Sequence, residues 1–232
     1  LSPEFTIFLL RGTDAMIWIG TSAIFFGAVM ALSQKDYKRM LSYIVIAEIG
    51  YIIGGMGVAN TTALKGAIFH IVNDALMVAC LFSVAGLVMH KTHGHSIDDF
   101  KGLFRNMPIT AIVFTVGALA VIGVPPTCGF FSKWYLLLGG IKAGQWAFVT
   151  ALLVSTLINV ALFFKIFDKG LYVHGQHDQP HDGSRGVALN SMEAPLSMLV
   201  PAVVLALAIL VVGIFNQTIM NNLIVFTVPP GL

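Results

Sequence analysis

Long apolar stretches separated by short polar ones dominate this chain. A helix crosses the roughly 30 Å hydrocarbon core of a bilayer with about 20 apolar residues, because it rises about 1.5 Å per residue. Six stretches fit this measure: residues 16–32, 41–59, 63–90, 109–139, 146–167 and 196–215. The pattern predicts an all-α, polytopic membrane helix bundle with about six transmembrane helices.

The fourth apolar stretch is interrupted. Its first part, residues 109–124, is followed by Pro125, Pro126 and Gly129, and helix is expected to resume near Phe130. Two prolines remove two backbone donors, and a glycine permits a turn. The sequence therefore predicts a fourth helix broken at Pro125-Pro126, with Gly129 in the break. Such breaks mark ion sites in transporters, but a proline kink that serves packing alone is the alternative.

The remaining segments are polar or amphipathic. Residues 174–193 predict an exposed, flexible loop, and residues 216–232 a tail that lies on the surface or docks on a partner. The chain starts with Leu1, and its first ten residues lack the basic region of a signal peptide. We expect a fragment or a trimmed chain.

Composition excludes a soluble protein. Only 10% of the residues are charged and 57% are hydrophobic, whereas soluble domains carry about 25% charged residues. Most of the surface must therefore face the lipid bilayer. The net charge of +2 is small, and no nucleic-acid partner is expected. Cys80 and Cys128 both lie in apolar segments, which argues against a disulfide framework or a thiolate metal site.

Basic residues orient the six predicted helices. Nine fall on one side of the membrane: Lys35, Lys38, Arg39, Lys91, Lys101, Arg105, Lys165, Lys169 and Arg185. Three fall on the other side: Arg11, Lys65 and Lys142. Basic residues accumulate on the cytoplasmic side of membrane proteins. We therefore predict a multi-pass protein of the cell (inner) membrane, with both termini of this chain outside the cytoplasm.

Four ionisable residues are predicted at membrane depth: Glu48, His70, Asp74 and Lys133. A charge at the bilayer centre costs about 2.5–3.5 kcal/mol, so such residues usually face the protein interior and serve a pathway or a structural pair. His70 and Asp74 are four residues apart and share one helical face. A histidine beside a carboxylate can relay protons. The alternative for this pair is a tie between helices.

Lys133 and Glu48 each allow two interpretations. Lys133 follows the predicted break closely, which favours a proton carrier over a lysine that extends to the membrane surface. Glu48 lies midway along the second helix and fits a pathway or a hydrogen bond to a neighbouring helix equally well.

Neither a metal site nor a catalytic site is predicted. No third Cys or His lies at the depth of His70 and Asp74 to complete a zinc site. Five histidines in polar segments are better explained as solvated loop residues than as a metal cluster: His93, His95, His174, His177 and His181. No nucleophile, phosphate-binding or dinucleotide motif occurs, so we expect no cofactor in this chain.

Three motifs resemble the antiporter-like membrane proteins shared by Mrp-type sodium/proton antiporters (their D and A components), respiratory complex I and membrane-bound hydrogenases. Residues 34–43 (QKDYKRMLSY) resemble the family's Q-x-D-x-K-R-x-x-A-Y segment. Residues 69–82 are similar to its H-x-x-N-H-A-x-x-K-x-x-L-F helix, and residues 123–133 (GVPPTCGFFSK) to its G-x-P-P-x-x-G-F-x-S-K break. The resemblance covers about residues 16–170.

The resemblance implies that residues 1–170 form the second of two inverted five-helix repeats. A polar loop (171–195) and a final transmembrane helix with its tail (196–232) would follow. Lys133 matches the lysine of the family's second broken helix, and His70 matches the first histidine of its relay helix. Asp74 replaces the second histidine, and Val78 replaces a lysine.

The family resemblance also implies function. We expect translocation of protons, with Na⁺ as a further candidate, within a complex that contains other membrane subunits. An Mrp-type antiporter is favoured because residues 131–136 are most similar to that branch. A proton-pumping subunit of a complex I-like NADH:quinone oxidoreductase or of a hydrogenase is one alternative, and a non-transporting scaffold is another.

Overall fold

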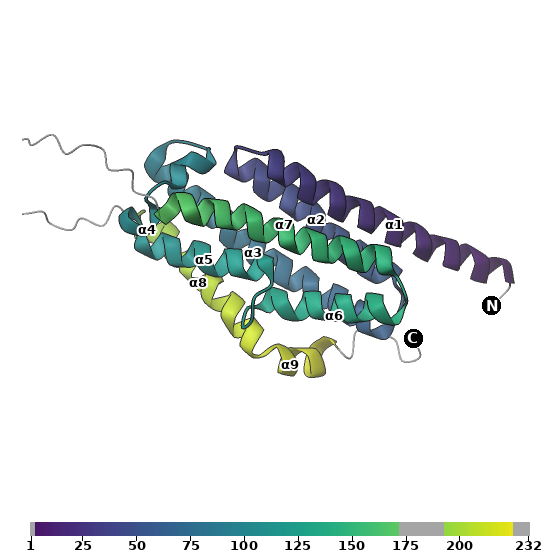
Figure 1. Ribbon diagram of the computed structural model, residues 1–232. Coiled ribbons are helices and arrows are strands. Elements are labelled where there is room, and N and C mark those ends of the chain that lie inside the picture. Colours follow the sequence, from purple (N-terminus) through teal and green to yellow (C-terminus); the bar gives the residue numbers. More distant parts are fainter. Residues whose placement is uncertain (1–2, 172–192, 225–232) are drawn as a thin grey trace, which may run out of the picture.

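Helices form the structure throughout the described chain. The computed structural model describes residues 3–171 and 193–224, and its elements pack lengthwise into one bundle (Figure 1). They are α1 (Pro3–Ser33), α2 (Tyr37–Gly57), α3 (Thr61–Thr92), η1 (Ile97–Phe100), α4 (Leu103–Asn106), α5 (Pro108–Ile122), α6 (Cys128–Lys142), α7 (Trp146–Leu171), α8 (Leu196–Ile214), α9 (Asn216–Ile219) and a π-helical turn, η2 (Met220–Ile224).

Five of these helices are long and apolar enough to cross a membrane: Gly12–Ser33 of α1, α2, α3, α7 and α8. The shorter apolar helix α5 and the helix α6 that follows it occupy the fourth predicted stretch. The prediction of an all-α membrane bundle is thus confirmed. The predicted loop 174–193 and the end of the predicted tail lie mostly outside the described residues.

The break in the fourth predicted helix is confirmed, but one of its residues differs from expectation. Gly123, with φ of 87°, ends α5, and α6 begins at Cys128. We predicted that Gly129 turns the chain within the break, but it already lies in the first turn of α6. A side chain on Gly129 would collide with the Ala120 carbonyl, so its role is close packing of α6 on α5.

Close backbone contact joins α1 and α2. A Cβ atom added to Gly20 would lie 2.5 Å from the amide nitrogen of Gly54. In lipid, small residues allow helices to approach closely and to gain van der Waals contact. This packing fixes the rotation of α2, and hence the side of α2 from which Glu48 points into the bundle.

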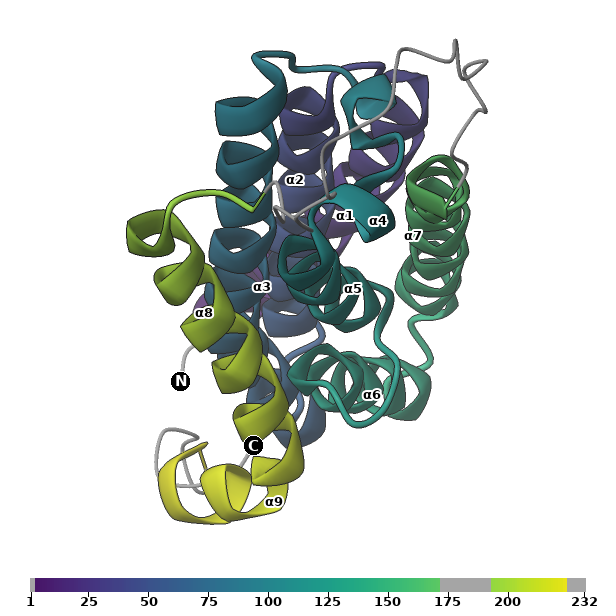
Figure 2. The ribbon, with the colours of Figure 1, turned by 90° about the vertical axis from the view of Figure 1, so that its left-hand side faces the viewer.

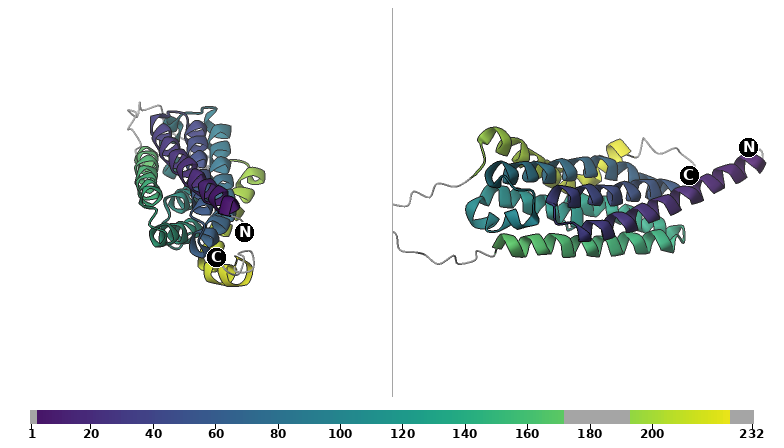
Figure 3. Two further views of the ribbon diagram at one scale, coloured as in Figure 1. Left: turned by 90° about the vertical axis from the view of Figure 1, so that its right-hand side faces the viewer. Right: turned by 90° about the horizontal axis from the view of Figure 1, so that it is seen from above.

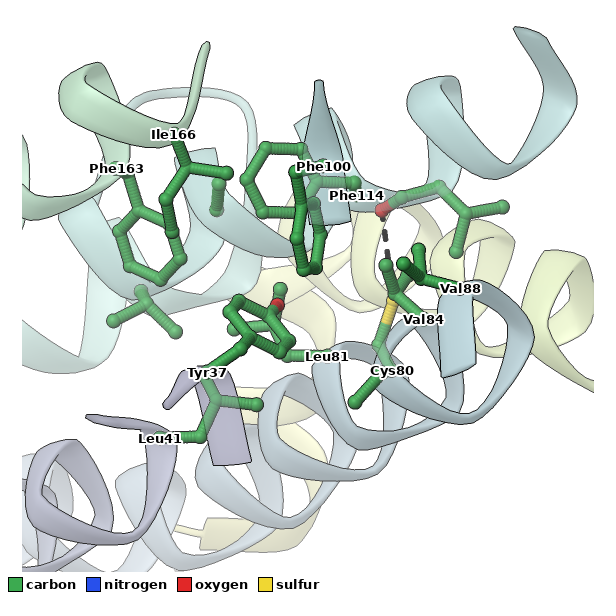
Figure 4. Close-up of a cluster of buried hydrophobic side chains, with 14 of the residues drawn as sticks. Tyr37, Leu41, Cys80, Leu81, Val84, Val88, Phe100, Phe114, Phe163 and Ile166 are labelled. Carbon is green, nitrogen blue, oxygen red and sulfur yellow. Dashed lines mark hydrogen bonds between the residues drawn. The ribbon is translucent and has the colours of Figure 1, made fainter. Parts of the chain in front are cut away.

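The end of the bundle that holds the α1–α2 turn is closed by apolar side chains (Figure 4). Tyr37, Phe100, Phe114 and Phe163, which we call the aromatic cluster, are all at most 2% exposed. The Tyr37 and Phe100 ring centroids are 4.4 Å apart, and those of Phe114 and Phe163 are 6.0 Å apart. Four elements, α2, η1, α5 and α7, thereby meet in one core.

Helix α8 crosses the bundle obliquely and ends against the break (Figures 2 and 3). Gly213 in its last turn packs on the backbone of Pro126 and Thr127, where a methyl group would collide. The helix that follows the predicted repeat therefore contacts the broken segment directly.

Candidate functional site at the broken helix

The break leaves backbone groups without their usual partners. In a continuous helix the Val121 carbonyl would accept a hydrogen bond from residue 125, but Pro125 has no N–H. Lys133 Nζ donates to this carbonyl instead. On the other side of the break, Asn73 Nδ2 donates to the Cys128 carbonyl at 2.9 Å. Lys133 thus binds a carbonyl that the break frees, as a break at membrane depth requires, and Asn73 joins the first turn of α6 to α3.

Lys133, Glu48 and His70 form a buried row that we call the lysine site. Lys133 Nζ lies 3.0 Å from Glu48 Oε1, and His70 Nε2 lies 2.9 Å from Glu48 Oε2. Glu48 and His70 are 0% exposed and Lys133 is 5% exposed. The first contact is a hydrogen-bonded ion pair, whereas the second has the distance of an ion pair without hydrogen-bond alignment.

Glu48 is therefore the centre of the site. It joins α2 to α6 through Lys133 and to α3 through His70. A buried ammonium and a buried carboxylate are each costly alone, so each is held here by the charge of the other. The row has ionisable groups on three helices in direct contact, which is the arrangement that proton transfer between helices requires.

The predicted pair of His70 and Asp74 is not formed. His70 Nδ1 lies 2.8 Å from Ser132 Oγ, and Nε2 lies 2.9 Å from Glu48 Oε2, so the ring faces Ser132 and Glu48 and not Asp74. Asp74 is half-buried, and its Oδ1 is buried without a hydrogen-bond partner among the described residues. One helical face does bring both residues toward the interior, but the inter-helix contact with Glu48 decides the orientation of His70.

Tyr51 and Ser132 belong to the site although the sequence alone pointed to no role for them. The Tyr51 ring centroid is 4.9 Å from Lys133 Nζ and 5.6 Å from the centroid of the His70 ring. Tyr51 lies three residues after Glu48 on the same face of α2, and Ser132 directly precedes Lys133. Helical spacing from Glu48 was therefore the signal that could have found Tyr51.

Metal binding has no support in the described residues. No group of three or more His, Cys, Asp or Glu side chains there could hold an ion. Cys80 and Cys128 are buried and free. Of the five loop histidines, His93 and His95 are described, while the other three lie outside the described residues.

The motif at residues 34–43 has a structural role at the end of the bundle. The Asp36 side chain caps α2 by accepting from the Arg39 amide at 2.9 Å. The Tyr37 amide donates to the His95 carbonyl, which ties the α1–α2 turn to the segment after α3. Nearby, Lys169 Nζ lies 2.6 Å from Asp98 Oδ1, and this hydrogen bond lowers the pKa of the Asp98 carboxyl.

Known proteins are similar to this chain in sequence and in fold. The family described as NADH:quinone oxidoreductase/Mrp antiporter, TM, matches residues 5–159. NADH-quinone oxidoreductase subunit N of Desulforudis audaxviator is 41% identical over 219 residues, which are 91% of this chain and 43% of that protein. A Na(+)/H(+) antiporter subunit of Alkalihalophilus pseudofirmus, of the D type, is 32% identical over 156 residues, which are 67% of this chain and 32% of that protein.

A solved structure is similar to this chain in fold. A chain of the Mrp complex from Dietzia sp. DQ12-45-1b superposes with a TM-score of 0.78 at 19% identity, over 91% of this chain and 46% of that one. The chain spans less than half the length of the curated relatives named above. By the extent of the family match, this chain belongs to the NADH:quinone oxidoreductase/Mrp antiporter transmembrane family.

Proposed function

We propose that this chain carries protons or cations across the membrane as part of an antiporter-like subunit in a multisubunit complex. The observation that carries the proposal is the lysine site, in which Lys133, Glu48 and His70 lie in contact within the apolar bundle. Ionisable groups in this setting are expensive and are usually retained for a pathway. Membership of the family supports the same function.

Lys133 is the central carrier in this proposal. When a proton reaches Glu48, the carboxylate loses its charge, and Lys133 keeps the Val121 carbonyl as its partner. When Lys133 instead releases a proton, its amine no longer pairs with Glu48. The position of Lys133, five residues into α6 after the break, lets one side chain contact both α5 and α2.

Ser132 can select the protonation state of His70. Its single hydroxyl hydrogen has two acceptors in reach, His70 Nδ1 at 2.8 Å and the Gly129 carbonyl at 3.2 Å. If Ser132 donates to His70, the ring hydrogen is on Nε2 and faces Glu48. If Ser132 donates to Gly129, Nδ1 must donate to Ser132, and a hydrogen on Nε2 then makes His70 an imidazolium. Uptake of a proton at Nδ1 by the tautomer with its hydrogen on Nε2 is therefore accompanied by rotation of the hydroxyl.

The distribution of basic residues also supports an orientation of the chain in the membrane. The basic residues of the α1–α2 turn, of the segment after α3 and of the end of α7 gather at one end of the bundle, which we assign to the cytoplasm. The termini of this chain would then lie outside the cytoplasm of an inner-membrane protein. Residues 1–170 would form the second repeat, and other membrane subunits would cover the exposed helix faces.

Two kinds of complex fit this function. Similarity to the D-type Na(+)/H(+) antiporter protein, and of residues 131–136 to the Mrp branch, favours an antiporter. The 41% identity to an NADH-quinone oxidoreductase subunit favours a redox-driven proton pump. Vesicles that carry the complex distinguish them, because an antiporter moves protons when a Na⁺ gradient is imposed and a redox pump does so when NADH is oxidised.

Replacement of Lys133 by alanine tests the proposal. We expect Lys133→Ala to abolish proton flux in vesicles that are matched to the parent for the amount of assembled complex. Lys142→Ala is the matched control, because Lys142 is exposed at the end of α6. Full flux in Lys133→Ala, with equal amounts of complex, would leave the chain as a non-transporting scaffold.

A further inference from the structure

Helix α7 carries two buried polar residues in an otherwise apolar interior face. Ser155 and Asn159, which we call the α7 polar stripe, are each 1% exposed and lie one turn apart. Their buried neighbours on α7 are apolar, including Leu152, Leu162 and Phe163. Helix α7 has no ionisable residue at this depth, and the lysine site draws only on α2, α3 and α6. The stripe therefore needs a separate explanation.

Tyr51 connects the α7 polar stripe to the lysine site. Tyr51 Oη donates to Ser155 Oγ at 2.8 Å, and the ring of the same tyrosine lies beneath Lys133 Nζ, 4.9 Å from its centroid. All of these side chains are buried. Tyr51 thus contacts Lys133 through its ring and α7 through its hydroxyl, whereas Glu48 and His70 contact no residue of α7 in the hydrogen bonds and ion pairs of the described residues.

Asn159 extends the stripe without making a helix tie. Its Nδ2 is buried and donates to no side chain or carbonyl among the described residues. A buried amide without a partner costs about 1–3 kcal/mol, and a residue that only joined helices would avoid this cost. Asn159 lies one helical turn, about 6 Å, beyond Ser155 along α7. It is therefore closer to the end of the bundle where Lys169 contacts Asp98.

We propose that Tyr51, Ser155 and Asn159 line a second limb of the ion pathway, which leads from Lys133 toward the basic end of the bundle. This inference rests on the proposed function of the lysine site. Past Asn159 the interior face of α7 continues with Phe163 and Ile166 into the aromatic cluster (Figure 4), where the buried Tyr37 hydroxyl also has no partner among the described residues. The limb thus ends at an apolar constriction, which can act as a gate because water must enter before an ion passes.

The proton step in this limb involves water as the carrier. Amide and hydroxyl groups do not take up a proton at neutral pH, so Asn159 Nδ2 donates to a water oxygen, Ser155 Oγ can bond a further water, and these waters carry the proton. Lys133 Nζ releases a proton to a water molecule, which becomes hydronium, and the lysine is left as a neutral amine. A proton that arrives at the lysine site restores the ammonium.

Flux measurements on Asn159 variants in the assembled complex test this limb. Asn159→Leu keeps the branching at the γ carbon and removes the polar group, and we expect proton flux to fall about tenfold, equivalent to the loss of one hydrogen bond to a charge. Asn159→Ser restores a polar group and should recover most of the flux. Thr150→Val is the control, because Thr150 is exposed on α7 and bonds only to its own helix, at the Trp146 carbonyl. Lys133→Ala is measured in parallel.

The outcomes separate this inference from the proposed function. If Lys133→Ala abolishes flux while Asn159→Leu stays within twofold of the parent, the limb is overturned and the lysine site stands. If Asn159→Ser is as slow as Asn159→Leu, packing explains the residue and the limb is again overturned. Flux in Lys133→Ala overturns both. Should Asn159→Leu fail to assemble, Ser155→Ala is measured against the same control, and parental flux in that variant overturns the limb.

Discussion

The lysine site and the aromatic cluster are both buried, but their interiors differ. The aromatic cluster closes one end of the bundle with Tyr37, Phe100, Phe114 and Phe163, whose rings pack against one another. The lysine site lies around the break and places an ammonium, a carboxylate and an imidazole in contact. Apolar packing alone would hold a bundle together at lower cost. The comparison therefore separates a region that stabilises the fold from one for which we propose a role in transport.

The largest effect on stability is expected in the aromatic cluster. Phe114 is 0% exposed, so Phe114→Ala should leave a cavity and cost about 3–5 kcal/mol, with loss of assembled protein. Phe164→Ala is the control, because Phe164 is 70% exposed on the same bundle. Thermal unfolding in detergent measures both variants. Equal stability of the two would show that the cluster does not hold the fold.

A large effect on flux, with little on assembly, is expected at His70. If His70 transfers protons, His70→Gln should lower flux about 100-fold, in the range for loss of a general acid–base group, and should change its pH profile. Asp74→Asn should have a smaller effect, because Asp74 lies outside the row of contacts. Flux in vesicles at several pH values measures both. If neither variant changes the pH profile, His70 is a structural tie.

The smallest effect is expected at the exposed end of the bundle. The hydrogen bond from Lys169 lowers the pKa of Asp98, so the pair stabilises the fold at neutral pH and loses this contribution as acid protonates the carboxyl. Asp98 is 58% exposed, and Asp98→Asn should therefore cost about 0.5 kcal/mol or less. Unfolding curves at neutral and acidic pH measure the difference. A cost that grows toward acidic pH would contradict this assignment.

The fold could be predicted well from the sequence, because the length of each apolar stretch and the position of each proline determine helix structure within the segment that contains them. The apolar stretches gave six crossings, and Pro125 and Pro126 located the break. Glycine roles were less predictable, since Gly129 and Gly123 look alike in sequence and only the packing of α6 on α5 distinguishes them.

The site was predicted as a set of residues but not as a set of contacts. Lys133, Glu48 and His70 were identified because charges are rare in apolar helices. That Glu48 rather than Asp74 faces His70 depends on how α2 and α3 are rotated against each other, which the glycine contacts of α2 help to set. Ser155 and Asn159 carry no charge, so their places emerged only from the packing of α7, whereas Tyr51 could have been found from its helical spacing to Glu48.

A double-variant cycle on Glu48 and Lys133 tests the central claim most directly. Glu48→Gln and Lys133→Met each leave one buried group without its partner, so each should lower both assembly and flux, and the loss of pairing costs about 3–5 kcal/mol. The double variant has no unpaired charge. We predict that it recovers assembly while proton flux in vesicles stays absent. Recovery of flux together with assembly would show that the pair only holds helices together and would contradict the role of Lys133 as the carrier.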